Sequence, residues 1–412
     1  MGAGPRGPGM NDSPGASRSL LATPWPIVGL AIAAGIVGAF QVGKAAIALP
    51  ALRADLGIGL VAAGWVLAIF SLIGVAAGMV VGAMVGRWGD RRMVLLGLVL
   101  VAAASLAGAA APGILFLLAT RFVEGIGFLM VVVGAPSLIA RLARPAHLKL
   151  ALGAWGAYMP AGQAIMMLAA PLLLVPFGWR GLWIANAILL VLFAAILAYA
   201  TAALPRQTMR PNFSLLGDLR DTLTAPGPLL LAAIFACYAM QYLAVMGFLP
   251  TILIEREGLG IAMAGGLAAL AVAMNGVGNV AGGVLLQRGA PRWFLVASAG
   301  FAMGSAALAI FTASPPLWAS YTLYLVFSGM AGLLPASVLG AVPLHAPNRH
   351  LVATTNGLVV QGSNLGQVIG PPAVGALAGA IGWSWTPLLI APAAVSVVLL
   401  ALALRRRERG RL

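Results

Sequence analysis

The sequence predicts an all-α membrane protein with twelve transmembrane helices in two pseudo-symmetric halves of six. Composition is the first observation, because 61% of the 412 residues are hydrophobic and the mean hydropathy is +1.02. Such a chain has too little polar surface for a water-soluble globule. The net charge of +15 comes from short basic clusters between apolar runs, with no aromatic and basic stripe, so nucleic acid is not an expected partner.

The lengths of the apolar runs are the second observation. A bilayer core of roughly 30 Å requires about 20 apolar residues per helix. This rule predicts helices over residues 26–51, 60–85, 92–111, 114–140, 151–175, 180–203, 228–253, 262–286, 293–312, 317–341, 351–380 and 385–404. We therefore expect a disordered tail (1–24), two six-helix halves (25–204 and 228–404), a cytoplasmic linker (205–227) and a basic tail (405–412).

Internal repetition is the third observation. Gln41 and Pro50 recur 200 positions later as Gln241 and Pro250. Three further pairs are separated by 201 positions: Gly82 and Gly283, Arg87 and Arg288, Arg91 and Arg292. Five pairs are separated by 204 positions: Gly153 and Gly357, Gly162 and Gly366, Gln163 and Gln367, Gly178 and Gly382, Trp179 and Trp383. A nearly constant offset indicates two repeated halves, an organisation common among secondary transporters.

The distribution of basic residues predicts the orientation. If the N-terminus is inside, the outer loops hold only Arg53, Arg180 and Arg256, and the cytoplasmic segments hold most of the other arginines. Because cationic loops stay on the cytoplasmic side, we expect both termini in the cytoplasm, at the inner membrane of a bacterium.

Two segments resemble signatures of the major facilitator superfamily. GAMVGRWGDRR (82–92) is similar to the signature between helices 2 and 3, with Gly82, Arg87, Gly89 and Arg91 in place. It departs at Gly86, where the family has Asp, and at Asp90, where a base is usual. LLATRFVEGIG (117–127) is similar to the helix-4 signature, with Glu124 in the place of a common Gln. A weaker likeness points to the cyanate- and nitroimidazole-type branch.

The resemblance implies that the turn between helices 2 and 3 is a latch, whose charges pair with helix ends of the other half when the cytoplasmic side is closed. We expect Asp90 to replace the missing acid, pairing with Arg87. A purely topogenic cluster remains the alternative reading of these charges.

Three ionisable residues lie well inside the predicted spans: Lys44, Arg121 and Glu124. Charges are costly in a bilayer, and the equivalent positions of the second half are uncharged, so these residues point to function. The resemblance implies that helices 1, 4, 7 and 10 line a central cavity, which would expose both cations to an anionic substrate. Glu124 is the expected proton site, and a structural pair between Arg121 and Glu124 is the alternative.

Neutral polar side chains complete the expected substrate site. Gln41 and Gln241 are expected to meet near the midplane from opposite halves, and Tyr238 and Tyr242 share a face with Gln241. Helix 11 contributes two further candidates, Gln361 and Asn364.

The expected function is secondary active transport of a small organic anion by alternating access, coupled to protons, by a monomer in the lipid bilayer. One alternative is a drug/proton antiporter for lipophilic or cationic compounds, although helix 5 (GAWGAYMPAGQAIMM) lacks the Gly-Pro of the antiporter signature. Another is a non-transporting receptor on the same scaffold. The absence of a P-loop excludes an ATP-driven pump, and the histidines fall outside the spans, so no metal site, cofactor or enzymatic activity is expected.

Overall fold

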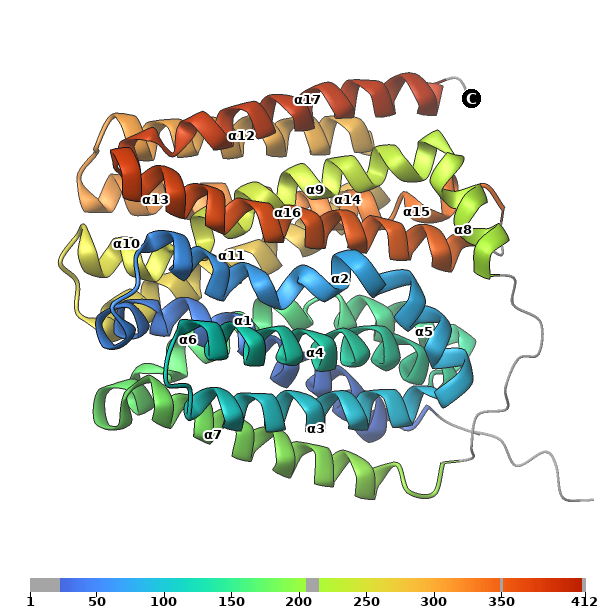
Figure 1. Ribbon diagram of the computed structural model, residues 1–412. Coiled ribbons are helices and arrows are strands. Elements are labelled where there is room, and N and C mark those ends of the chain that lie inside the picture. The colour runs from blue at the N-terminus through green and yellow to red at the C-terminus, as the bar shows by residue number, and fades with distance from the viewer. Residues whose placement is uncertain (1–22, 205–214, 349–350, 410–412) are drawn as a thin grey trace, which may run out of the picture.

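The computed structural model describes residues 23–204, 215–348 and 351–409, and these are almost entirely helical (Figure 1). The N-terminal half contains α1 (Trp25–Leu56), α2 (Leu60–Trp88), α3 (Asp90–Ala109), α4 (Ile114–Leu142), α5 (Pro145–Trp155), α6 (Tyr158–Ala169) and α7 (Pro171–Ala200). A short helix, α8 (Leu215–Thr224), lies within the polar connection between the halves.

The C-terminal half repeats this plan with more interruptions. Its helices are α9 (Pro226–Met246), α10 (Leu249–Glu255), α11 (Ile261–Gln287), α12 (Arg292–Thr312), α13 (Leu317–Ala331), α14 (Leu333–Leu339), α15 (Val342–His345), α16 (Val352–Ile381) and α17 (Pro387–Arg409), with a 3-10 turn at Trp383–Trp385. One interruption precedes Pro250: α9 ends at Met246, and α10 begins at Leu249, beside this proline.

Ten segments of the described chain are long and apolar enough to cross a membrane, and two further crossings complete the twelve that were predicted. The fifth crossing is broken between Trp155 and Tyr158, so neither α5 nor α6 is long enough alone. The eleventh, α16, is 30 residues long but carries several amide side chains, which lower its hydropathy. The protein is therefore an integral membrane protein with the predicted twelve-helix architecture.

Left-handed glycines confirm the internal repeat. Six glycines in the described chain have positive φ, and they form three pairs at offsets of 201, 200 and 204: Gly57 and Gly258, Gly89 and Gly289, Gly178 and Gly382. Each pair occupies the same turn in the two halves, after the first, second and fifth crossings. Side chains disfavour this conformation, so the repeated glycines preserve the same backbone turns in both halves.

The boundary between the halves consists of two long helix contacts. α16 packs along α2 on one side, and α11 packs along α6 on the other. Glycines permit close approach: a Cβ atom added to Gly64 would lie 2.5 Å from the carbonyl oxygen of Pro371, and one added to Gly375 would lie 2.3 Å from that of Leu60. Around these two glycines the α2–α16 contact is therefore backbone against backbone, whereas Gly74 and Gly78 of α2 lie against the side chains of Asn364 and Gln361.

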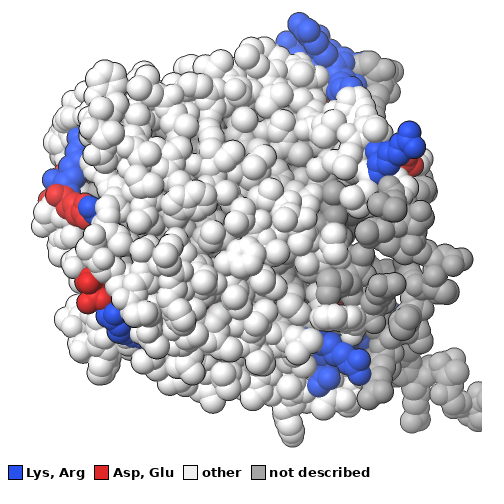
Figure 2. Space-filling view, in the orientation of Figure 1, with Lys and Arg blue, Asp and Glu red and all other residues white. Residues whose placement is uncertain are grey.

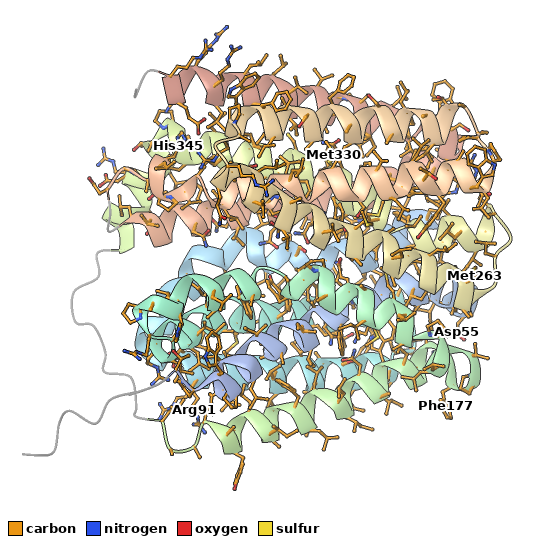
Figure 3. All side chains as sticks on the ribbon, turned by 180° about the vertical axis from the view of Figure 1, so that it is seen from behind. Asp55, Arg91, Phe177, Met263, Met330 and His345 are labelled. Carbon is orange, nitrogen blue, oxygen red and sulfur yellow. The ribbon has the colours of Figure 1, made fainter. Side chains whose placement is uncertain are left out.

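Charged side chains gather at two opposite ends of the molecule, and the visible face between them is uncharged (Figure 2). Arg91 and His345 lie at one end, and Asp55 lies at the other (Figure 3). The first residues of α1 and the last of α17 lie at the same end as Arg91 and His345 (Figure 1). This distribution fits a membrane-spanning body with an apolar belt.

At the opposite end, an ion pair between Arg53 on α1 and Glu255 on α10 joins the two halves. α1 also packs against α10 at this end. A second ion pair, between Asp55 and Arg180, lies within the N-terminal half. The Arg53–Glu255 pair therefore ties the halves together on the side that the sequence predicts to be extracellular.

Candidate functional site

A cavity of about 220 Å³ lies between the two halves. Helices α2, α4 and α6 line it from the N-terminal half, and α9, α11, α14 and α16 line it from the C-terminal half. This position, between two repeated halves, is where transporters of this architecture hold their substrates.

Aromatic side chains flank the cavity from both halves. The N-terminal half contributes Phe70, whose ring lies 4.9 Å from that of Phe128, with Tyr158 beyond. The C-terminal half contributes a stack on α9, in which Tyr238 lies 5.4 Å from Phe235 and 5.8 Å from Tyr242. Planar apolar compounds can therefore be held between two aromatic walls.

The polar groups of the cavity are amides and hydroxyls. Gln163 and Gln367, which are equivalent in the repeat, both line it. The hydroxyl of Ser71 donates to Oε1 of Gln367 at 3.0 Å, which links α2 to α16 across the boundary. None of the described residues that line the cavity is charged; the other polar members are Asn275, Asn279, Ser363 and Asn364.

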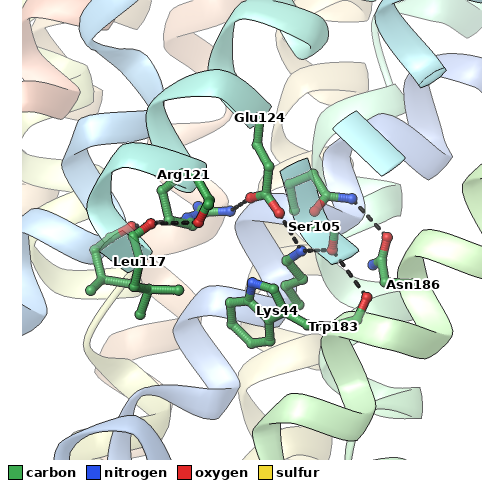
Figure 4. A network of polar contacts seen from close by, with 10 residues as sticks. Lys44, Ser105, Leu117, Arg121, Glu124, Trp183 and Asn186 are labelled. Carbon is green, nitrogen blue, oxygen red and sulfur yellow. Dashed lines mark hydrogen bonds and ion pairs between the residues drawn. The ribbon is translucent and has the colours of Figure 1, made fainter. Parts of the chain in front are cut away.

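The three ionisable residues predicted from the sequence form one cluster, but inside the N-terminal half (Figure 4). Nζ of Lys44 lies 2.7 Å from Oε1 of Glu124, and Arg121 pairs with the other carboxylate oxygen. The side chains are 0% exposed for Lys44 and Glu124, and 1% exposed for Arg121. An acid shared by two cations satisfies both of its oxygens, as buried charges require.

Neighbouring helices complete the shell around the cluster. Lys44 donates to Oγ of Ser105 on α3 at 2.6 Å, and its Nζ lies 4.5 Å from the ring centroid of Trp183 on α7. Arg121 donates from Nε to the carbonyl oxygen of Val66 at 3.3 Å. Its guanidinium lies 4.8 Å from the centroid of the Phe70 ring. Phe70 also lines the cavity, so its ring contacts both the charge cluster and the cavity.

The structure places the predicted substrate residues in two groups. Tyr238, Tyr242 and Asn364 line the cavity. Gln361 lies beside it and donates to the carbonyl oxygen of Val75 on α2 at 3.1 Å, across the boundary. Tyr238, Tyr242 and Asn364 are thus exposed to the cavity, and their part in substrate binding stays a prediction.

The second group consists of Lys44, Arg121, Gln41 and Gln241, which the structure places away from the cavity lining. Gln41 donates to Oδ1 of Asn186 on α7 at 2.8 Å, and Gln241 donates to a carbonyl oxygen of its own helix. The two glutamines therefore make their contacts within separate halves. Lys44 and Arg121 face the interior of the N-terminal half, where both pair with Glu124, so the expectation that they line the cavity was wrong.

Sequence reasoning missed the aromatic wall of the N-terminal half and Gln163. The repeat carried a signal for the glutamine, because Gln163 and Gln367 are matched at the same offset as the neighbouring glycines. Phe70 and Phe128 carried no such signal, since single aromatic residues are ordinary in apolar helices.

The predicted latch residues lie at the end of the molecule that holds both chain termini. Asp90 is 1% exposed and accepts hydrogen bonds from Nε and a terminal nitrogen of Arg141, both at 2.8 Å. Arg91 donates to the hydroxyl of Thr201 at 2.8 Å. These contacts lie within the N-terminal half. The surroundings of Gly82 and Arg87, including the expected pairing of Asp90 with Arg87, lie outside the described residues.

Gly89 occupies the turn before α3 with φ of 85°, a conformation that favours glycine. The glycine at this position of the family signature therefore occupies a turn whose backbone conformation favours glycine.

Comparison with solved structures supports the architecture. A bacterial homologue of the human lysosomal transporter Spinster, in an inward-facing and unoccupied conformation, matches with a TM-score of 0.72 and 16% identity over 91% of this chain and 97% of that chain. The occupied form of that homologue also matches with a TM-score of 0.72, over 92% and 93% of the two chains. At this identity, the likeness shows the fold alone.

Curated relatives align with part of the chain. An uncharacterised MFS-type transporter of Mycobacterium tuberculosis is 32% identical over 47% of this chain and 34% of its own length. A probable actinorhodin transporter of Streptomyces coelicolor is 31% identical over 52% and 37%, and the methyl viologen resistance protein of Salmonella typhimurium is 34% identical over 40% and 33%. This chain thus spans about a third of the length of these relatives.

The profile of the Major Facilitator Superfamily matches residues 30–360, which is most of the chain. Together with the twelve crossings assigned to the described residues, the repeated halves and the cavity between them, this match shows that the chain belongs to the major facilitator superfamily of transporters.

Proposed function

We propose that the protein exports lipophilic compounds, either neutral or with a delocalised positive charge, by alternating access driven by a proton gradient. The observation that carries this proposal is the lining of the cavity: two aromatic walls and neutral amides, with no charged side chain among the described residues that line it. An aromatic face attracts a desolvated organic cation and also packs against an uncharged ring.

The relatives support transport out of the cell and the same class of substrate. They include resistance proteins for methyl viologen, lincomycin and puromycin. Methyl viologen is a delocalised organic dication, which suits aromatic walls better than a cavity lined with fixed cations. We therefore favour a drug/proton antiporter over a transporter of organic anions, although helix 5 lacks the Gly-Pro step of the antiporter signature.

The orientation and the latch belong to the same proposal. Both termini lie in the cytoplasm of a bacterial inner membrane, consistent with the excess of arginine at that end. The turn around Asp90 and Arg91 controls exchange between the two conformations, through contacts that anchor it to α4 and α7 in the present state.

A transport assay with ethidium, a fluorescent lipophilic cation, tests the proposal. The purified protein in proteoliposomes should move ethidium against its gradient when a pH gradient is imposed. Tyr238→Ala should weaken ethidium binding about 2- to 30-fold, the effect of losing one cation–π contact of roughly 0.5–2 kcal/mol. Tyr199→Ala is the matched control, because Tyr199 is 88% exposed on α7 and is not among the residues that line the cavity.

An anion screen tests the competing reading. If mono- or dicarboxylates raise the melting temperature of the protein and the rise disappears in Lys44→Ala and Arg121→Ala, the substrate is an anion and the proposal is wrong. If no solute moves in response to a gradient while ligands still bind, the receptor reading replaces transport.

A further inference from the structure

The buried cluster of Lys44, Arg121 and Glu124 contains more positive than negative charge when all three groups are ionised. Among the described residues, Glu124 is the only carboxylate that pairs with either cation. The three side chains are almost completely shielded from solvent. The cluster thus holds one uncompensated positive charge in a region where uncompensated charge is expensive.

Counting charges identifies the group that can exchange a proton most easily. If Glu124 bound a proton, the cluster would carry two positive charges. If Lys44 released one, the cluster would be neutral, with Arg121 and Glu124 remaining as an ion pair. Arg121 stays charged in either case, because a guanidinium is not deprotonated in proteins. Proton exchange on Lys44 therefore changes the net charge of the cluster between +1 and 0, whereas exchange on Glu124 would change it between +1 and +2.

We propose that Lys44, and not Glu124, binds and releases the coupling proton, through the juxtaposition of its amine with Glu124, Arg121 and Ser105. The N–H bond of the ammonium breaks, the electron pair stays on Nζ and the proton leaves to water. This proposal deepens the proposed function, because the coupling it describes rests on proton-driven export.

The hydrogen bonds around Lys44 can accommodate both forms. As an ammonium, Nζ donates to Oε1 of Glu124 and to Oγ of Ser105, whose hydroxyl proton is directed to the carbonyl oxygen of Trp183 at 3.0 Å. As a neutral amine, Nζ keeps its bond to Glu124 and accepts from Ser105 after the hydroxyl rotates. A neutral lysine therefore has a hydrogen-bond donor for its lone pair, from Ser105, and keeps an acceptor for one of its N–H groups, on Glu124.

Other charged groups on the helices around α1 lie toward its ends. At its last turn, Arg53 pairs with Glu255 of α10, and Asp55 pairs with Arg180 of α7. At its start, His147 of α5 contacts Thr23. The described parts of α2 and α6 bring no charged side chain to Lys44, and α3 brings Ser105. The charge on Lys44 is therefore governed chiefly by the two α4 residues.

Phe70 connects the cluster to the cavity. The guanidinium of Arg121 lies over one face of this ring, and the ring is part of the cavity lining. When Lys44 is charged, it shares the carboxylate with Arg121; when Lys44 is neutral, Arg121 becomes its sole ionic partner. A change in how Arg121 is held thus alters the aromatic wall that contacts the exported compound.

The lysine content permits a direct measurement that needs no substrate. The chain contains only two lysines, Lys44 and Lys149, so protein labelled with ¹³C-lysine gives two Cε signals. The signal that persists in Lys149→Arg belongs to Lys44. We expect the chemical shift of this signal to change with pH over roughly pH 6 to 9, whereas an ordinary lysine titrates near about 10.4.

Transport by two substituted proteins provides the second measurement. Lys44→Arg keeps the charge but removes the exchangeable proton, and Lys44→Met is permanently neutral. In both, transport of ethidium driven by a pH gradient should fall at least about tenfold, while ethidium still binds, because neither change removes a residue of the cavity lining.

The outcomes separate this inference from the proposed function. A Lys44 signal that stays constant from pH 6 to 9, or a Lys44→Arg protein that retains transport driven by a pH gradient, overturns the lysine assignment and leaves an ion-pair cluster with a structural role. A titrating Lys44 signal in a protein that moves no ethidium supports the lysine as a proton site and refutes the proposed substrate class.

Discussion

Where the N-terminal half buries Lys44, Arg121 and Glu124, the C-terminal half has Ala244, Leu325 and Ser328 at the equivalent positions of the repeat. Both halves nevertheless form the same order of membrane crossings, with the same glycine turns among the described residues. The scaffold therefore forms without these charges. The two halves therefore differ in their buried charge, whereas both place aromatic side chains at the cavity.

The largest expected effect comes from removing the acid that holds the two cations. Glu124→Leu leaves Lys44 and Arg121 buried with no counter-charge, and should lower the free energy of unfolding by about 3–5 kcal/mol. Ser328→Ala, the matched change in the C-terminal half, should cost no more than about 1 kcal/mol. Unfolding by SDS in mixed micelles measures both. Equal losses in the two proteins would refute the contrast.

A triple substitution sharpens this first comparison. Replacing the cluster by apolar residues of similar size, as Lys44→Met, Arg121→Met and Glu124→Leu, should recover most of the stability lost in Glu124→Leu alone, because no buried charge remains. Transport driven by a pH gradient should still be absent. A triple variant as unstable as the single one would show that the charges support the fold.

The second effect concerns two glycines at equivalent positions of α4 and α13. A Cβ atom at Gly125 would lie 2.1 Å from the carbonyl oxygen of Phe70, whereas one at Gly329 would lie 3.7 Å from Cε of Met274. Gly125→Ala must push α2 away, so we expect a cost of about 1–3 kcal/mol and weaker ethidium binding beside Phe70. Gly329→Ala should be neutral, or stabilising by up to about 1 kcal/mol. Thermal unfolding in detergent distinguishes the two, and the reverse order would contradict the packing.

The third effect compares the arginine contacts at the ends of the two halves. Asp90→Ala removes two hydrogen bonds with Arg141 from a buried carboxylate, and we expect a loss of about 1.5–3 kcal/mol together with slower transport. Glu408→Ala removes a partly exposed pair with Arg292 in the C-terminal half, and should cost less than about 1 kcal/mol. Unfolding measurements and initial transport rates test this order. An Asp90→Ala protein that loses ethidium affinity as strongly as rate would count against a latch.

The smallest effect concerns the ion pair that joins the halves. Arg53→Ala should shift the balance toward the conformation that is open at the outer end, by up to about fivefold, because a partly exposed pair is worth at most about 1 kcal/mol. Asp55→Ala is the control, since its partner Arg180 lies in the same half. Distances between spin labels on the outer ends of the two halves report the shift. A similar shift in both proteins would remove the special role of the Arg53–Glu255 pair.

The sequence was sufficient for the fold because long apolar runs, basic clusters and a constant repeat offset are visible without any structure. The predicted gap between residues 175 and 180 coincides with the non-helical backbone at Gly178 within α7, whereas the first helix ends at Leu56 and not at residue 51. The breaks within crossings were not predicted. α1 continues through Pro50, whereas its repeat breaks just before Pro250, so a proline alone does not decide the outcome.

The candidate site was predicted only in part. The sequence singled out Lys44, Arg121 and Glu124, and the pairing of Arg121 with Glu124 follows from their spacing. The direction of these side chains did not follow, because α1 and α4 are apolar on all sides and their pattern does not mark the face toward the cavity. Contacts to Ser105 and Trp183 come from helices distant in sequence, and only the fold brings them together.

The backbone contact between α2 and α16 affects how the halves can move. Interlocked long side chains must change rotamer whenever two helices tilt against each other, and each change adds to the energy barrier. Gly64 and Gly375 instead place smooth helix surfaces against the opposite backbone. We expect such surfaces to let one half rotate by small angles against the other without repacking side chains. A bulky residue at either glycine would interlock the two helices and slow exchange between conformations, even in a protein whose cavity lining is unchanged.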